Sequence, residues 1–186
     1  HDKVGNRLTK TEPDNKTSYG YDAIYRLLKA QDNKQESFTY DPVGNRLTSS
    51  SLRGSGANAA ISSYTHNANN ELVQSSRGSA EATSYQYDSN GNLVKKTETD
   101  DWKTRTWTYS YDFENRLVKA VKQKAKTAST VTVSFKYDPF GRRIEKKVEK
   151  TASPLAGDDP DEEESGEAEI KTYTYVYDNE DIILEY

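Results

Sequence analysis

One four-residue pattern recurs along the chain: an aromatic residue, any residue, tyrosine and aspartate. Full copies occupy residues 19–22, 38–41, 85–88, 109–112, 135–138 and 175–178. A degenerate copy stands at Tyr64-Thr65-His66-Asn67, and a truncated copy, His1-Asp2, opens the chain. A pattern that returns every few tens of residues indicates a repeat architecture in which each copy is one supersecondary unit.

Each copy has the chemistry of a β-hairpin. Side chains alternate between the two faces of a strand, so both aromatic positions lie on one face. The aspartate starts a turn, because its carboxylate can accept backbone N–H groups two residues further on. The third residue after it is in most copies one that tolerates positive φ, and Tyr25 is the exception. The predicted structural turn residues are Asp41, Gly44, Asp88, Gly91, Asp112, Asn115, Asp138 and Gly141.

The leucine or isoleucine after each turn does not keep a constant distance from the aspartate. It lies five residues on at Leu93 and Leu117, but six residues on at Leu8, Leu47 and Ile144. An extra residue in a hairpin either bulges out or moves every later side chain to the other face. We therefore expect a β-bulge in the three longer copies, near Asn6, Asn45 and Arg142.

The repeats predict an all-β fold over residues 1–186, with about eight tandem antiparallel hairpins, the first truncated, in a curved or spiralling sheet. An open barrel is one form that such a sheet can take. Residues 49–62 are rich in Ser, Gly and Ala and are predicted to form a loop between hairpins. Residues 155–168 carry a dense run of acidic residues and are predicted to be a disordered insertion.

Composition limits the classes of partner. The mean hydropathy of −1.04 would by itself suggest disorder, but 14 Tyr and 2 Trp can bury large rings while keeping their polar tips satisfied. The net charge of −4 gives no reason to expect nucleic acid. There are no cysteines, so disulfides are excluded. No apolar run approaches the roughly 20 residues of a membrane span.

The repeated unit resembles the YD repeats of bacterial RHS proteins, to which repeats of insecticidal toxin complexes and animal teneurins are related. Tyr40-Asp41-Pro42-Val43-Gly44-Asn45-Arg46-Leu47 and Tyr137-Asp138-Pro139-Phe140-Gly141-Arg142-Arg143-Ile144 are most similar to it. The resemblance implies a strip of hairpins that helps to form a β-shell around a C-terminal toxin. The expected partner is then the rest of its own parent chain, a toxin or core domain, and the expected location is secreted or at the cell surface of a bacterium.

No residue set points to catalysis or to a cofactor. His1 and His66 both occupy tyrosine positions and have no accompanying triad or zinc-site residues. Residues 88–92 resemble the start of a calcium loop, but Thr99 stands where the bidentate glutamate belongs. Aspartate at the start of a turn explains the same residues without a ligand. We therefore predict no catalytic, cofactor-binding or metal-binding residues, with weak calcium binding by residues 158–164 as a minor alternative.

Two tryptophans leave a second function open. Trp102 and Trp107 could stack on sugars, which would make the chain a cell-surface adhesion or carbohydrate-binding module. Trp107 lies two residues before Tyr109, on the same strand face, so cross-strand packing is the favoured interpretation for it. Self-association through unpaired strand edges is a further expected contact.

Overall fold

The computed structural model describes residues 1–53, 60–125, 129–151, 168–178 and 181–185, which form strands and turns and contain no helix. Accordingly, no helix of a length and apolarity that could cross a membrane occurs among them. The chain divides into two compact units, His1–Ala82 and Thr83–Tyr186, and one strand, β8 (Glu81–Tyr87), contains the boundary.

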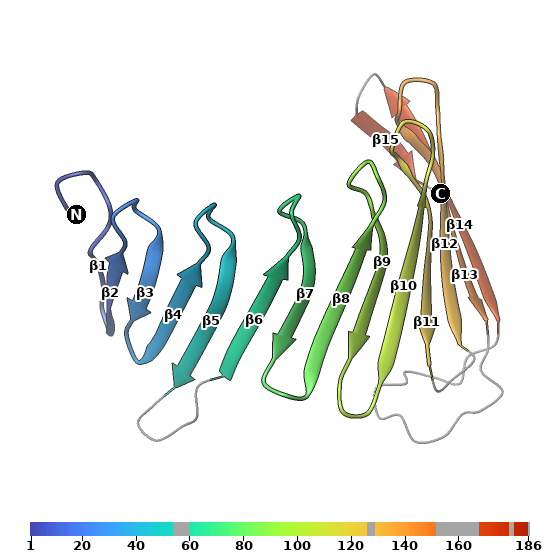
Figure 1. The fold of residues 1–186 in the computed structure, drawn as a ribbon. Coiled ribbons are helices and arrows are strands. Elements are labelled where there is room, and N and C mark those ends of the chain that lie inside the picture. The colour runs from blue at the N-terminus through green and yellow to red at the C-terminus, as the bar shows by residue number, and fades with distance from the viewer. Residues whose placement is uncertain (54–59, 126–128, 152–167, 179–180, 186) are drawn as a thin grey trace. The chain divides into compact units, whose positions relative to one another are not determined.

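The first unit is a run of antiparallel strands in chain order (Figure 1). The strands are β1 (Thr9–Glu12), β2 (Asn15–Tyr21), β3 (Leu27–Gln31), β4 (Lys34–Tyr40), β5 (Arg46–Arg53), β6 (Ala60–His66) and β7 (Leu72–Arg77). Each pairs with the next one along the chain. None of the pairs described within this unit joins its first strand to its last, so its sheet is open.

The second unit repeats this arrangement. Its strands are β9 (Leu93–Thr99), β10 (Thr104–Tyr111), β11 (Leu117–Lys124), β12 (Thr130–Tyr137), β13 (Arg143–Thr151), β14 (Glu169–Asp178) and β15 (Asp181–Glu185). Each again pairs antiparallel with its successor. The predicted all-β fold of tandem antiparallel hairpins is confirmed.

The expected bulge is confirmed in the Asp41 and Asp138 copies, but its restriction to the longer copies is wrong. In every hairpin that is closed by a repeat turn and has a described register, the tyrosine or histidine before the turn is paired, and the ladder shifts by one residue beside it. The shift leaves one apolar residue outside the pairing on the returning strand: Leu28, Leu47, Val73, Val118, Ile144 or Ile183. The Asp41 and Asp138 copies carry no insertion relative to the Asp112 copy, because Leu117 occupies the paired position that Arg46 and Arg143 fill in those copies.

The Ser-rich loop is shorter than predicted. β5 extends to Arg53 and β6 begins at Ala60, and Ser49 pairs with both Phe38 and Ser62. Serine has little intrinsic preference against a strand, so pairing with neighbours on both sides decides its conformation. The remaining loop residues, 54–59, lie outside the described residues. So do residues 155–167 of the predicted acidic insertion, while Ala168 directly precedes β14.

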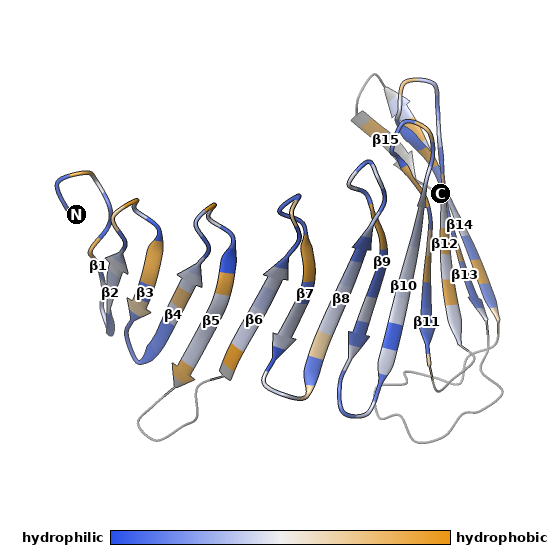
Figure 2. Ribbon diagram, viewed as in Figure 1, coloured by the Kyte–Doolittle hydropathy of each residue, from blue (hydrophilic) through white to orange (hydrophobic). Residues whose placement is uncertain are grey.

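Neither unit has a conventional core. Tyr175, 6 % exposed, is the only buried apolar residue among those described, and no described side chain is fully buried. Figure 2 shows hydrophilic and hydrophobic residues interleaved along the strands. The sheet is therefore stabilised by partly covered rings, aliphatic stems and hydrogen bonds rather than by an oily interior.

The turns explain why glycine and asparagine recur at one position. The third residue after the turn aspartate has positive φ in seven turns, at Gly5, Tyr25, Gly44, Asn70, Gly91, Asn115 and Gly141. Tyr25, the exception in sequence, adopts the same conformation with φ of 67° and is 57 % exposed. A bulky residue in the left-handed region is strained.

Replacing Tyr25 with glycine should therefore stabilise the chain by about 0.5–1 kcal/mol, because relief of the strain exceeds the entropy that glycine adds to the unfolded state. The matched control is Gly44→Ala, where φ is 102° and nothing lies within 4 Å of an added Cβ, so that only backbone strain is introduced. It should destabilise by about 1 kcal/mol. Urea unfolding followed by circular dichroism measures both, and a destabilised Tyr25→Gly variant would contradict this account.

Candidate functional site at the aspartate turns

Each turn aspartate organises its own loop through its carboxylate. In the turn at Asp138, Oδ1 accepts the backbone N–H groups of Phe140 (2.9 Å) and Arg142 (3.0 Å), and the backbone N–H of Gly141 donates to the Asp138 carbonyl (3.0 Å). Asp112 accepts the corresponding pair of N–H groups at 3.0 and 2.9 Å. The aspartate carboxylate therefore accepts the backbone N–H groups that the turn itself leaves without a hydrogen-bond acceptor.

These contacts keep the aspartates ionised. At Asp41, Asp112 and Asp138, partial burial works to raise the pKa, but the combined hydrogen bonds from side chains and backbone outweigh it and lower the pKa of each carboxyl. At Asp88 the side-chain amide of Asn92 is the largest influence and lowers the pKa. The turns thus depend on the charged form of the carboxylate.

A second contact joins five of the hairpins to the one before. The hydroxyl of the tyrosine that precedes the turn donates to a backbone carbonyl on the returning strand of the preceding hairpin. The pairs are Tyr21 to Arg7 (3.0 Å), Tyr40 to Leu27 (2.8 Å), Tyr111 to Leu93 (3.0 Å), Tyr137 to Leu117 (2.8 Å) and Tyr177 to Arg143 (2.8 Å). The acceptor is in each case the fifth residue after the preceding turn aspartate. We call this contact the tyrosine strap.

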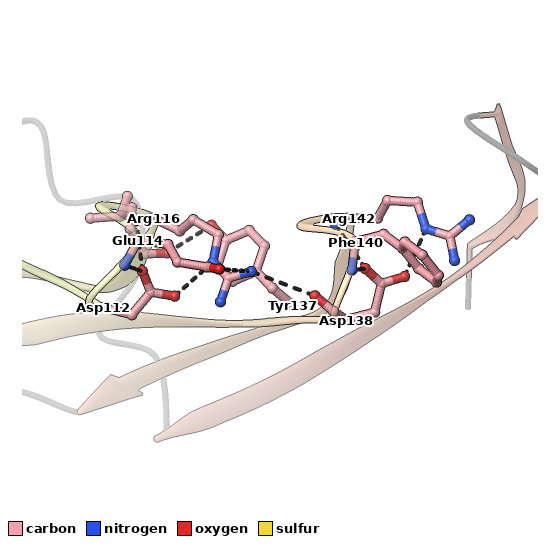
Figure 3. A network of polar contacts seen from close by, with 8 residues as sticks. Asp112, Glu114, Arg116, Tyr137, Asp138, Phe140 and Arg142 are labelled. Carbon is pink, nitrogen blue, oxygen red and sulfur yellow. Dashed lines mark hydrogen bonds and ion pairs between the residues drawn. The ribbon is translucent and has the colours of Figure 1, made fainter.

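An arginine at the fourth position after the aspartate links neighbouring turns. Arg116 donates from Nε to its own Asp112 (2.7 Å) and from Nη1 to the backbone carbonyl of Asp138 (3.5 Å), as Figure 3 shows. Its guanidinium also lies 5.1 Å from the ring centroid of Tyr137. Arg26 repeats all three contacts, with Asp22, the Asp41 carbonyl and the Tyr40 ring. The planar fork of arginine suits such a shared role.

Where Asn45 and Asn92 occupy the fourth position, a different link forms. Asn45 donates to its own Asp41 (2.9 Å) and to the Asn70 side chain in the next turn (3.0 Å). Asn92 likewise donates to its own aspartate and, at 2.8 Å, to Asn115. The asparagine is too short to reach the next backbone, and in both cases the next turn carries asparagine rather than glycine at its third position. Arg26 and Arg116 are followed instead by Gly44 and Gly141, whereas Asn6, followed by Tyr25, and Arg142, followed by Asp181, lie outside this pattern.

The degenerate copy retains its turn but lacks the strap. Asn67 Oδ1 accepts the N–H groups of Asn69 and Glu71, both at 3.0 Å. His66 occupies the tyrosine position and has no hydroxyl, and its buried Nδ1 has no hydrogen-bond partner among the described residues. The degenerate copy therefore keeps the hydrogen bonds within its turn and loses the hydrogen bond to the preceding hairpin.

Comparison with known proteins identifies the repeat. The family model described as teneurin YD-shell matches residues 3–153. The chain belongs to the teneurin YD-shell family. It is a structural repeat segment of that family, and a search of curated proteins finds no match.

Solved structures share the YD-shell fold. The chain is similar to a crystal structure of TcdB2-TccC3-Cdc42, with a TM-score of 0.69 and 18 % identity, over 88 % of this chain and 9 % of that chain. A TcdB2-TccC3-TEV structure gives 0.54 and 15 %, over 89 % and 10 %. A Photorhabdus luminescens Tc holotoxin pore gives 0.52 and 13 %, over 99 % and 13 %. The YD-shell chain thus spans about a tenth of the length of these larger proteins.

The two tryptophans of the YD-shell chain have different environments. Trp102 is 75 % exposed at the β9–β10 turn, where its backbone N–H donates to Asp100 (3.0 Å). Trp107 is on β10 with the ammonium groups of Lys96 and Lys122 at 4.9 and 5.4 Å from its ring. Lysines from the two neighbouring strands thus lie over the ring of Trp107, whereas the side chain of Trp102 is exposed to solvent.

The described residues include no group of three or more His, Cys, Asp or Glu placed to hold a metal ion. In the calcium-like segment, the Asp88 carboxylate instead accepts the backbone N–H groups of Asn90 and Asn92, both at 2.9 Å, and the Asn92 amide. The predicted turn residues thus stand at successive turns, and what sequence reasoning missed is the set of residues that joins one turn to the next.

Removing one strap tests its contribution. Tyr111→Phe should lower the free energy of unfolding by about 1 kcal/mol, because the Leu93 carbonyl loses its donor. His66→Tyr is the converse change and should raise stability by about 1 kcal/mol, since the new hydroxyl can donate to the Arg46 carbonyl at the equivalent position. Both are read by urea denaturation. If Tyr111→Phe left the free energy of unfolding unchanged and His66→Tyr lowered it, the strap would not be a stabilising contact.

Acid should unfold the chain through its turns. The pKa of Asp2, Asp22, Asp41, Asp88, Asp112 and Asp138 is lowered in the folded chain. The unfolded chain therefore takes up protons first as the pH falls, near the ordinary aspartate pKa of about 3.9. Stability should be fully present above about pH 5 and lost as the pH falls through 4 and below. Urea midpoints measured from pH 7 to pH 3 test this, and a midpoint unchanged at pH 3 would contradict it.

Proposed function

We propose that this YD-shell segment is part of a β-shell wall that encloses a C-terminal effector of its parent chain and performs no chemistry itself. The observation that carries the proposal is the repeated coupling of neighbouring hairpins by the tyrosine strap and the turn links. These contacts hold successive hairpins together without a buried core, which is what a wall one sheet thick requires.

Three further observations support this function. The family model covers most of the chain. The similar solved structures are toxin-complex chains about ten times longer, of which a segment like this forms a small part. The exposed rings and charges do not converge on a reactive group in the described residues. We accordingly place the parent protein outside the cell or at the surface of a bacterium, with the rest of its own chain as principal partner.

Carbohydrate recognition is the second candidate, and it depends on Trp102. That ring is open to solvent at a turn, as a sugar-stacking platform would be. Trp107 contributes little to this candidate, because two lysines cover its ring.

Limited proteolysis of the parent protein tests enclosure. The region after Tyr186 should survive a protease that cuts within residues 155–168, because a wall excludes the enzyme from its contents. A variant with Tyr111→Phe and Tyr137→Phe should lose this protection, since two straps in the wall are removed. Mass spectrometry of the fragments gives the cleavage order. Cleavage of the downstream region as fast as residues 155–168 in the unaltered protein would reject enclosure and favour carbohydrate recognition.

A further inference from the structure

The two faces of the sheet in the second unit differ in chemistry. One face carries the aromatic residues of the repeats, and the register places on the same face Lys96, Arg105, Lys122, Lys124, Arg143, Lys146, Lys150 and Lys171, with Glu98 and Glu169 as the acidic residues whose side chains are described. The opposite face is rich in threonine and serine and carries Lys95, Lys119, Lys136 and Lys147 with Glu145 and Glu149. Among the described side chains, the aromatic face thus has an excess of six cationic residues and the other face an excess of two.

Three of these lysines form a straight row across the strands. Lys96 on β9 pairs with Trp107 on β10, which pairs with Lys122 on β11. Lys122 pairs with Val131 on β12, which pairs with Lys150 on β13. We call Lys96, Trp107, Lys122, Val131 and Lys150 the lysine row. Its cations stand on alternate strands, about 10 Å apart, because neighbouring strands are about 4.8 Å apart.

Internal partners only partly neutralise the lysine row. Lys96 pairs with Glu98 (2.5 Å), and Lys150 shares Glu169 with Lys171. Lys122 lies over the Trp107 ring and has no acidic partner among the described residues. The Lys150 side chain is 54 % exposed. The row therefore presents positive charge, with the apolar surface of Trp107 and Val131 between the cations, although the whole chain has a net charge of −4.

We propose that the lysine row is a docking surface for an extended acidic polypeptide that crosses the strands. Charge complementarity and spacing together select this partner. A polyproline II segment advances about 3.1 Å per residue with three residues per turn, so side chains at every third position point the same way about 9 Å apart. Carboxylates at that interval match lysines on alternate strands.

Nucleic acid fits this surface less well. Single strands bind through basic grooves in which bases stack on open aromatic rings. On this face the rings are already covered by cations: Trp107 by two lysines, Phe135 and Tyr175 by Arg143, and Tyr173 by Lys146. Carboxylates need only the ammonium groups. The inference concerns this surface alone and holds whether or not the shell encloses an effector.

Two synthetic peptides of equal composition, made of Glu, Pro and Ser, test the row on the 186-residue chain. One has Glu at every third position and the other has all its Glu in one block. Calorimetry and Trp107 fluorescence, the latter in a Trp102→Phe background, measure binding. The peptide with period three should bind more tightly, and binding should weaken steeply as salt is raised. Equal affinity for the two peptides, or no binding at low salt, would overturn the proposal.

Matched variants separate the row from general positive charge. Replacing Lys96, Lys122 and Lys150 with Gln should weaken binding about tenfold, since three ion pairs at partly exposed lysines together are worth roughly that factor. Replacing Lys95, Lys119 and Lys147, which lie on the same three strands and the opposite face, removes equal charge and should change affinity less than about twofold.

A variant in which Arg replaces the three row lysines keeps the positive charge and should retain binding. Circular dichroism of each variant shows whether a loss of binding comes from misfolding. Equal losses from the two glutamine triple variants would overturn the proposal. So would tighter binding to heparin than to the periodic peptide, with the same lysine dependence, because it would assign the row to a sulfated polysaccharide.

Discussion

The hydrogen bond from a tyrosine hydroxyl to the carbonyl of the preceding hairpin is the contact on which the architecture depends. A two-stranded hairpin is at best marginally stable alone in water. This chain adds no buried core to compensate, since Tyr175 alone is buried among the apolar residues described. The strap supplies a directional contact at five junctions, and it satisfies a carbonyl next to the bulge, where the ladder shifts its register. The bulge and the strap therefore form one structural unit, which we call the bulge–strap unit.

The sequence predicted only part of this bulge–strap unit. Alternation of aromatic residues, the turn aspartate and the glycine at the third position predicted the hairpins, because each rests on local backbone chemistry. The bulge was misread because Leu117 and Leu47 look like the same residue displaced by one position. They occupy different positions: Leu117 is paired, and Leu47 lies outside the pairing. Hydropathy cannot distinguish these positions when both accept leucine.

The links between turns were also missed, although the sequence contained a signal for them. Asn45 and Asn92 at the fourth position are each followed, one repeat later, by asparagine at the third position, whereas Arg26 and Arg116 are followed by glycine. Single copies show no such relation. It appears only when the residue types of neighbouring repeats are compared, because the contact is made between repeats rather than within one.

At these four junctions neighbouring repeats are matched rather than interchangeable. An arginine reaches the next backbone directly, and it needs no side chain at the following third position. Asn45 and Asn92 stop short of it and donate instead to the side-chain oxygen of an asparagine there. In repeat proteins stability is approximately a sum of terms within each repeat and terms between neighbours. The degenerate copy separates these two terms: Asn67 and Asn70 preserve its turn, while His66 lacks the strap. Sequence drift in such a strip is thus least costly where it leaves the turn intact and weakens a single junction.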